Sequence, residues 1–529
     1  MATDQVSSGG VPLAPGAFEG DLVRLGHRLR QHRKTLIAIG LFLGFAVYYA
    51  IGLYPGIGGT INAGDSAKFQ VLGLAQIMVH GPGYPLVLMI GAALRNLQLP
   101  IAPWWQVAFV LSALPAAFAN AMSFLIAERA TGSLRFGVAA ALIVGSAHLM
   151  AIQATEAEVY ALNIAFVLTV IYLLTLFVDT ERIGFFVAAS AVYAISFGDH
   201  LMMVMLLPLF LVLTAFYHRL ILRPQPVLAI LAFILLGASQ YLYLAAVAGD
   251  PATRYSEYMP LRPSLGEFLR YILGFYFVKS YGSGLDSWRT LEALGRTFQA
   301  AHPWIWAPLL GAGLLAFAAG GRKAPDPAWR RVALLHAGAL CFLPFVLWYG
   351  VWDIRAFHLP VLALALLAAV ASLGWALATR PAALRALGLL LVLVGAVRLA
   401  QTGWNLVDRQ PALAGLVPAV KAVLAEQPQI PGSHPVLALD YDLRMAVMYH
   451  VFAGDLPRGP EYRLSWHVPD NVTVRPAIAG SLIGGRAKEF VRKVRERNPA
   501  MACRVSPLAV PDLHHRKAYG FRCDTRPRG

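Results

Sequence analysis

The chain has 529 residues, of which 58% are apolar and only 14% are charged, whereas a soluble globular protein is about 45–50% apolar and about 25% charged. This composition excludes an ordinary soluble enzyme and indicates an integral membrane protein. The net charge of +16 would suit a nucleic-acid-binding protein, but basic residues beside apolar spans report membrane orientation instead. Three cysteines are too few for a cysteine-rich zinc or iron–sulfur protein.

Eleven apolar runs have the length and composition of membrane spans. The first follows a basic tail, 1–35, which we expect to lie in the cytoplasm before an uncleaved anchor. In chain order the runs are 36–54, 105–127, 136–152, 159–178, 183–197, 201–217, 227–247, 304–319, 332–349, 357–377 and 382–400. They predict a transmembrane region over 36–400.

A further apolar run at 83–97 is short and is flanked by prolines on both sides. A helix of its length rises about 22 Å, less than the roughly 30 Å of a hydrocarbon core. If it does not cross, sixteen Lys and Arg residues fall on one side, against four (Lys68, Arg95, Arg355 and Arg398) in the short segments of the other. The positive-inside rule therefore favours eleven crossings, with 82–97 as a re-entrant or interfacial helix.

This topology places three large segments outside the membrane. They are a first outer loop with interfacial helices (55–104), a long loop (248–303) and a tail (401–529) that reads as a small α/β domain. In the tail, 436–439 is a predicted strand and 443–452 a predicted helix, with Asp440 and Asp442 as N-cap candidates.

Later in the tail, a basic helix at 486–497 precedes strand-like pieces around Cys503 and at 519–523. The basic helix contacts anionic lipid headgroups or presents a solvated basic face. Cys503 and Cys523 lie on the side of the membrane that permits disulfides, so they form a bridge or remain two unpaired thiols.

Polar and ionisable residues gather at outer membrane ends, where such groups are costly and tend to be functional. The clusters are 62–68, 80–85, 156–160, 198–200 and 352–358. All of them fall on one face, although the topology comes from lysine and arginine counts alone. This agreement indicates one site near the outer interface.

The first cluster contains Asp65, which lies soon after the first span and begins an amphipathic run, 66–79. One interpretation is a helix N-cap, because an Asp side chain ahead of a helix accepts hydrogen bonds from its first backbone N–H groups. The other is a general base, because a carboxylate in a partly dry pocket can take a proton from an acceptor hydroxyl. Both roles are compatible.

The next two clusters supply a histidine, a tyrosine and a carboxylate. His80 and Tyr84 flank Gly81 and Gly83, which let a ligand approach the backbone; the same stretch can equally be a simple turn between two interfacial helices. Glu158 lies at the first turn of a span, where it is either a solvated turn residue or a buried carboxylate that needs a partner.

The last two clusters combine acidic and basic side chains. Asp199 and His200 lie in a break between two spans, where they bind substrate or satisfy each other. Asp353 and Arg355 form a salt bridge or bind a ligand, and the planar guanidinium of Arg355 matches a phosphate group. Trp352 fits the aromatic belt of the membrane surface.

Some motifs are absent from the sequence. It contains no G-x-x-x-x-G-K-[ST] segment, so ATP hydrolysis is not supported. It contains no H-E-x-x-H segment and no dense His/Asp/Glu cluster, so no metal site is predicted.

The polar clusters resemble those of the DUF2723 or protein O-mannosyltransferase-like family of multispan proteins. That family has an Asp-Ser-Gly-Glu-like stretch, then His-Pro-Pro-Gly-Tyr-Pro, then Glu-Val-Tyr opening a later span. The counterparts here are 65–68, 80–85, 158–160 and 198–200, within a match that covers roughly 36–208. Gly81 replaces the first proline of the pair, and Lys68 stands where the family usually has an acid.

The resemblance implies the GT-C glycosyltransferase superfamily, with a polyprenyl-phosphate sugar donor and without a nucleotide-sugar Rossmann domain. We therefore expect a mainly α, polytopic GT-C-type bundle of about 11 spans with interfacial helices and a small extracytoplasmic α/β domain. It would transfer a sugar, with mannose favoured, to a glycan, lipid or protein hydroxyl at the outer face of a bacterial inner membrane. No cofactor or metal is expected, because a monophosphate leaving group gives a metal less to do.

In this hypothesis Asp65 is the general base, Glu158 a second catalytic carboxylate, and the mechanism is inverting. Arg355, Lys68 or His80 would stabilise the departing phosphate, while Glu158 and His200 orient sugar or acceptor. The expected substrate-binding residues are Lys68, His80, Tyr84, Tyr160, Asp199, His200, Asp353, Arg355 and His358.

The alternative function is a transporter or flippase of lipid-linked sugar, in which the same residues bind and no chemistry occurs. A site for transfer would be one outer pocket, whereas a transport path would continue to the cytoplasmic side. No comparable polar cluster marks the inner ends, which favours the pocket. A third reading, an inert anchor carrying a binding module, leaves the carboxylates at the membrane edge unexplained.

Overall fold

The computed structural model describes residues 32–255, 264–275, 287–321, 327–351, 353–425, 436–458, 461–464, 477–483, 492–496, 499, 501–507 and 518–525. Residues 1–31 of the expected cytoplasmic tail, Trp352 and most of the expected basic helix at 486–497 lie outside the described residues.

Helices make up most of the described chain. The helices of its first half are α2 (Arg33–Ile51), α3 (Ala63–Val71), α4 (Pro85–Leu97), α5 (Pro103–Ala108), the π-helical turn η1 (Phe109–Ala113), α6 (Leu114–Thr131), α7 (Leu134–Gly145), α8 (His148–Thr155), α9 (Tyr160–Thr180), α10 (Ile183–Ser196), the 3-10 helix η2 (Leu201–Leu206), α11 (Leu207–Phe216), α12 (His218–Ile221) and α13 (Pro224–Gly249). Those that follow are α14 (Leu265–Ile272), α15 (Ser287–Ala301), α16 (Trp306–Gly321), α17 (Pro327–Trp348), α18 (Ile354–Phe357), α19 (Leu359–Ala376), α20 (Pro381–Val407), α21 (Leu416–Ala425) and α22 (Tyr441–Ala453).

Seven helices of the described chain are long and apolar enough to cross a membrane, and two bent pairs can be counted as one span each. The bent pairs are α7 with α8, which meet at 67°, and α15 with α16, which meet at 103°. All eleven runs expected from the sequence are helical, but Ile183–Ser196 and Leu201–Phe216 are shorter apolar helices. By length and composition the count is therefore seven to nine spans, against the eleven expected.

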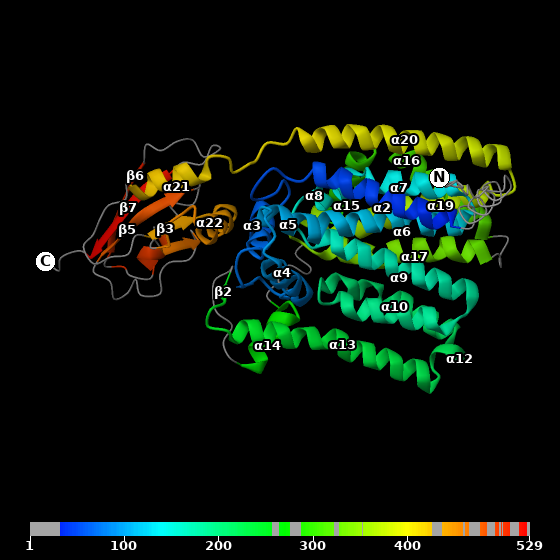
Figure 1. The fold of residues 1–529 in the computed structure, drawn as a ribbon, viewed down its shortest axis with the longest axis horizontal. Coiled ribbons are helices and arrows are strands. Elements are labelled where there is room, and N and C mark those ends of the chain that lie inside the picture. Colours follow the sequence, from blue (N-terminus) through cyan, green and yellow to red (C-terminus); the bar gives the residue numbers. More distant parts are fainter. Residues whose placement is uncertain are drawn as a thin grey trace, which may run out of the picture.

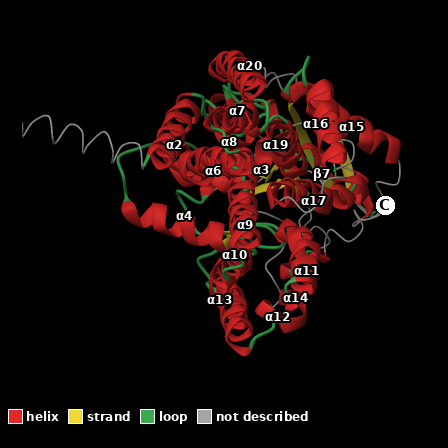
Figure 2. Ribbon diagram, turned by 90° about the vertical axis from the view of Figure 1, so that its right-hand side faces the viewer, coloured by secondary structure: helices red, strands yellow, loops and turns green. Residues whose placement is uncertain are grey.

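The outer helices present apolar side chains to their surroundings, as a protein in contact with lipid must. Phe216 of α11 and Leu242 of α13 are 79% and 73% exposed. Leu168 of α9 and Leu364 of α19 are fully buried. Figure 2, which looks along the long axis, shows α6, α9 and α19 inside, with α2, α13 and α20 around them. The core thus lies between inner helices that are apolar all round.

Helix α4 is the short apolar run that the sequence places at the membrane surface. In Figure 2 it lies across the view, whereas the long inner helices are seen nearly end-on. It packs closely on the chain after α3, since a Cβ on Gly91 would lie 2.8 Å from the Cβ of Leu72. Its direction is the one expected of an interfacial helix.

The C-terminal part forms a mixed five-stranded sheet in the order β4-β3-β5-β7-β6. Its strands are β3 (Val436–Leu439), β4 (Glu461–Leu464), β5 (Ala477–Ile483), β6 (Met501–Pro507) and β7 (Ala518–Thr525), while β1 (Ile77–Met78) and β2 (Arg254–Tyr255) pair elsewhere. Strand β3 is parallel to β4 and β5, and β7 is antiparallel to β5 and β6. Cys503 is disulfide-bonded and stands opposite Cys523 in the β6–β7 register.

This sheet, with α21 and α22, lies at one end of the molecule, beyond the linker that follows α20 (Figure 1). Helix α22 is the part of it that packs against α3. Asp440 caps α22 by accepting a hydrogen bond from the backbone N–H of Leu443 at 3.0 Å. The other N-cap candidate, Asp442, lies inside the helix and reaches α3 instead.

Candidate functional site

Helix α3 carries the central residues of the site. Its N-cap is Asn62, whose side chain accepts a hydrogen bond from the backbone N–H of Asp65 at 2.9 Å. The N-cap interpretation of Asp65 is therefore wrong, because the chain already supplies a better cap one turn earlier. Asp65 and Lys68 stand three residues apart, a spacing that puts two side chains on one face of a helix. They form an ion pair there.

Three donors surround the Asp65 carboxylate. Lys68 Nζ and the hydroxyl of Tyr441 both donate to Oδ1, Tyr441 at 2.6 Å, and the Asn62 amide donates to Oδ2. Burial acts to raise the pKa of Asp65, but the charges of Lys68 and His80 and these hydrogen bonds prevail and lower the pKa to about 2. Asp65 is thus a carboxylate at any physiological pH, and 17% of its side chain remains exposed.

Lys68 is fully buried, which is rare for lysine and requires partners. Besides Asp65, its ammonium lies 2.6 Å from His80 Nδ1. Because an ammonium can only donate, Nδ1 accepts, so the proton of the neutral imidazole lies on Nε2. That nitrogen lies 3.2 Å from the hydroxyl of Tyr84. Burial and the neighbouring Lys68 charge lower the pKa of His80 to about 3, so His80 is neutral.

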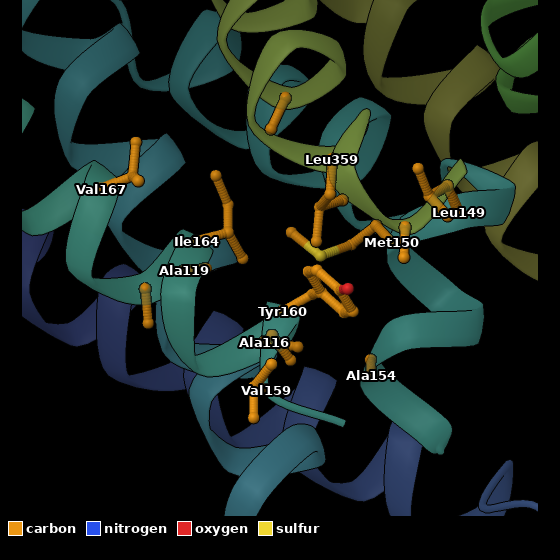
Figure 3. Packing of buried hydrophobic residues seen from close by; sticks show 14 of the residues in the cluster. Ala116, Ala119, Leu149, Met150, Ala154, Val159, Tyr160, Ile164, Val167 and Leu359 are labelled. Carbon is orange, nitrogen blue, oxygen red and sulfur yellow. The ribbon is translucent and has the colours of Figure 1, made fainter. Parts of the chain in front are cut away.

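A series of ring contacts continues from His80 through Tyr84 to His200. The ring of Tyr84 lies 5.8 Å from that of His200, which in turn lies 5.6 Å from Tyr160 and 5.7 Å from Phe357. Figure 3 shows the Tyr160 ring among Met150, Leu359 and Ala116. Tyr160 therefore serves the hydrophobic core as well as the aromatic cluster. These ring pairs are tilted or edge-to-face, and all four rings are buried.

Two more carboxylates lie near Asp65. Glu158 accepts a hydrogen bond from Ser66 Oγ at 3.3 Å, and Asp353 lies 3.4 Å from the Asn62 amide. Burial, together with the charge of Asp65, raises the pKa of Glu158 well above its usual range. The same causes raise the pKa of Asp353 to about 6. The pKa of Asp65 is thus lowered while those of its two neighbours are raised, and such differences between neighbouring carboxylates are typical of acid–base sites.

Asp199 and His200 do not pair with each other. The Nδ1 atom of His200 instead accepts a hydrogen bond from the backbone N–H of Met202 at 3.0 Å, which starts η2. Asp199 is fully buried, and burial raises its pKa well above the usual range, with Asn163 acting against the shift. Of the two interpretations of this pair, the one in which the residues satisfy each other is therefore wrong. The His200 ring belongs to the aromatic cluster.

The remaining expected residues lie apart from Asp65. His358 is buried, with its Nδ1 atom 2.8 Å from the Thr297 hydroxyl. Arg355 is exposed at the beginning of α18. Within the described residues it forms no ion pair with Asp353, so the salt bridge considered above is not made. Arg355 lies two residues after Asp353, and its exposed guanidinium can contact a ligand.

Two features of the site escape sequence reasoning. Tyr441 is 376 residues away from Asp65 in the chain, and its segment carries no motif that would indicate a site. Glu156, within the polar cluster 156–160, is buried and forms with Arg409 an ion pair of 3.0 Å that the sequence does not indicate. Arg409 also donates to the carbonyl of Gly52 at 2.6 Å. These contacts fix the start of the linker to the membrane part.

No group of three His, Cys, Asp or Glu side chains suited to a metal ion occurs among the described residues. Near Asp65, the position beside the carboxylate is filled by the Lys68 ammonium. The positive charge that neutralises the Asp65 carboxylate is therefore supplied by a lysine side chain.

The fold and part of the sequence match known proteins. Residues 65–221 match the family model described as the N-terminal domain of the protein O-mannosyl-transferase TMEM260. The structure of ArnT from Cupriavidus metallidurans in the apo state is similar, with a TM-score of 0.54 and 14% sequence identity over 91% of this chain and 97% of that chain. No curated protein matches the sequence. The chain therefore has a fold similar to that of ArnT.

Proposed function

We propose that the chain is a membrane glycosyltransferase that moves a sugar from a polyprenyl-phosphate carrier to an acceptor hydroxyl with inversion. The observation that carries the proposal is the Asp65 carboxylate, which buried Lys68 keeps ionised. This carboxylate is partly exposed and lies next to the aromatic cluster, at one end of an ArnT-like fold. A family match that begins at Asp65 supports it. Mannose is the favoured sugar.

In the proposed reaction the acceptor oxygen attacks the anomeric carbon as its proton passes to Asp65. The bond between that carbon and the carrier phosphate breaks, and its electron pair leaves with the phosphate. One displacement on the face opposite the leaving group inverts the anomeric centre. Glu158 and His200 would orient sugar or acceptor, and Tyr84 and Tyr160 would contact the sugar.

The departing phosphate requires a cation, since stabilising the charge that develops on a leaving group is often the largest electrostatic contribution to catalysis. Lys68 is already engaged with Asp65, and His80 is neutral. Arg355 is exposed, and its guanidinium matches a phosphate. We therefore assign the carrier phosphate to Arg355, and we assign Lys68 and His80 to the support of Asp65. No metal ion is required in this scheme.

The proposed location is the outer face of a bacterial inner membrane. The site lies at the end of the helical region that faces the C-terminal sheet (Figure 1). The positive-inside rule places that end outside. The acceptor would be a hydroxyl of a glycan, a lipid or a protein, and no nucleic acid is involved.

The test is sugar transfer by the purified chain from polyprenyl-phosphate-mannose and from its glucose, galactose and arabinose counterparts to hydroxyl acceptors. We expect transfer from one donor, inversion of the anomeric centre, and activity that survives EDTA. Movement of the intact lipid-linked sugar across vesicles, without cleavage of the sugar–phosphate bond for any donor, would instead indicate a transporter or flippase.

A further inference from the structure

The contact between α3 and α22 brings the C-terminal segment directly onto Asp65. The Tyr441 hydroxyl lies 2.6 Å from Asp65 Oδ1 and 3.3 Å from Lys68 Nζ. The next residue, Asp442, accepts a hydrogen bond from the backbone N–H of Gly64 at 3.0 Å. Helix α22 thus binds the two residues that form the centre of the site.

The fit between the two helices depends on one glycine. A Cβ on Gly64 would lie 2.4 Å from Cδ1 and 2.5 Å from Cε1 of Tyr441, and 2.9 Å from Asp442 Oδ1. Such distances are well inside van der Waals contact, so any side chain at this position would force α22 away from α3. The docked arrangement therefore requires glycine where α3 passes beneath the Tyr441 ring.

The Tyr441 hydroxyl lies where the substrate hydroxyl would have to bind if Asp65 acts as the general base. A hydroxyl within about 2.6–3.2 Å of a carboxylate is in position to give up its proton, and Tyr441 meets this distance. Its hydrogen bond also helps to lower the pKa of Asp65 to about 2, whereas a base works best with a pKa nearer the operating pH. Asp65 is therefore occupied and weakly basic while α22 is docked.

We propose that the acceptor binds between α3 and α22, where its hydroxyl replaces that of Tyr441, and that docked α22 is a displaceable cover of this acceptor subsite. The inference rests on the proposed function and identifies where its acceptor enters. The contact comes from the C-terminal segment, so the cover opens toward the side of the membrane on which that segment lies.

The charges at this contact indicate the class of acceptor. Asp65, Asp353 and Asp442 bring three carboxylates to the subsite, and Lys68 is already paired with one of them. A phosphate or carboxylate acceptor would be repelled by this surface. A neutral hydroxyl, on a sugar or on a Ser, Thr or Tyr side chain, forms the hydrogen bond that Tyr441 makes without adding charge.

The experiment measures KM for the acceptor and kcat in the full-length chain, with Tyr441→Phe and Gly64→Ala compared with the unaltered protein. A closed cover reduces the apparent affinity for the acceptor by the fraction of open molecules. We expect both substitutions to lower the acceptor KM, Tyr441→Phe by roughly tenfold because one hydrogen bond to a charged group is removed. We expect kcat to be equal or higher, and donor hydrolysis without acceptor to increase.

Gly295→Ala in α15 is the matched control for Gly64→Ala, because a Cβ there would meet no atom within 4 Å; it should leave both constants unchanged. Transfer by the unaltered chain, together with an unchanged acceptor KM in both variants, would overturn the cover and leave the glycosyltransferase intact. A fall in kcat of tenfold or more at constant KM would also overturn it, because Tyr441 would then assist the chemistry while docked. Absence of both transfer and hydrolysis in every protein would remove the proposed function and the inference with it.

Discussion

Lys68 illustrates how one residue can serve a site without touching the substrate. Its stem and ammonium are fully buried, and its charge is shared between Asp65 and the lone pair of His80 Nδ1. An unpaired ammonium at this depth would be strongly unfavourable, so all three side chains depend on each other. The sequence marks Lys68 as a departure from the family pattern, and the structure shows the departure to be an ion pair.

Replacing Lys68 by methionine keeps most of the stem and removes the charge. Burial and the nearby Glu158 and Asp353 carboxylates should then raise the pKa of Asp65, so that less of it is ionised at neutral pH. We expect the acidic limb of the pH–rate profile, which reports the pKa of Asp65, to move upward by more than about one unit. Lys421→Met, at an exposed position of α21, is the control. A profile that does not move would contradict this role.

His80 makes a prediction about pH and stability. Its pKa is about 3 in the folded chain, against about 6.5 when unfolded. Between these pH values the unfolded chain binds a proton at His80 that the folded chain does not bind. The contribution of His80 to stability therefore falls as the pH is lowered from about 6.5 toward 3, by up to about 1.4 kcal/mol per pH unit. His200, with a pKa of about 4, acts in the same direction.

The measurement is the thermal unfolding midpoint in detergent at pH 7 and at pH 5. His80→Asn retains an acceptor where Nδ1 lies but cannot titrate, so its midpoint at pH 5, relative to that at pH 7, should be higher than in the unaltered chain. His218→Asn, at an exposed site on α12, should keep the full dependence. If His80→Asn also keeps it, His80 is not held neutral.

Among the elements, the linker after α20 depends on a buried ion pair. The side chains of Arg409 and Glu156 are 11% and 1% exposed. Arg409 also donates to the hydroxyl of Thr155 at 2.9 Å. Removing one partner leaves the other charge buried without compensation, which typically costs 3–5 kcal/mol. The pair therefore holds the beginning of the C-terminal segment on the membrane part.

We expect Arg409→Met to lower the free energy of unfolding by about 3 kcal/mol. The control is Arg296→Met, which breaks an exposed pair with Glu292 on α15 and should change it by less than about 1 kcal/mol. In Glu156→Met/Arg409→Met both charges are gone, so part of the loss should be recovered. Equal effects of Arg409→Met and Arg296→Met would show that the buried pair is not a clamp.

At this scale the sequence predicts elements better than their contacts. The apolar runs are helical, and β3 occupies the residues expected of a strand, because hydrophobic periodicity and turn residues are local signals. The cap of α3 is missed, since Asn62 and Asp65 are both good caps and only the backbone path decides between them. Tyr441 is missed because its contact joins two distant segments, and no local pattern reports a long-range contact.

For the whole molecule, the polar clusters on one predicted face converge only in part. Direct contacts connect six of the expected residues: Asp65, Lys68, His80, Tyr84, Tyr160 and His200. Glu158 and Asp353 are linked to this group through Ser66 and Asn62. Arg355, His358 and Asp199 belong to the same end of the fold but not to the carboxylate cluster. The topology rule places residues at one end of a bundle, whereas side-chain packing decides which of them meet.

The path of the chain across the membrane can be tested with single cysteines. If α4 lies at the surface, Thr60→Cys and Gln98→Cys label from the same side of sealed vesicles with a membrane-impermeant maleimide, and Glu181→Cys labels from the other. All three positions are exposed, and Cys341→Ser removes the free thiol. Labelling of Thr60→Cys and Glu181→Cys from one side, with Gln98→Cys from the other, would show that α4 crosses.

The most direct test of the proposed chemistry is single-turnover transfer by Asp65→Asn. The amide keeps the shape of the side chain and an oxygen facing Lys68, but it cannot take a proton from the acceptor. We predict donor binding within about threefold of the unaltered chain and transfer slower by about 10²–10⁴-fold, the usual contribution of a general base. A variant that folds normally and transfers sugar at the unaltered rate would contradict the assignment of Asp65.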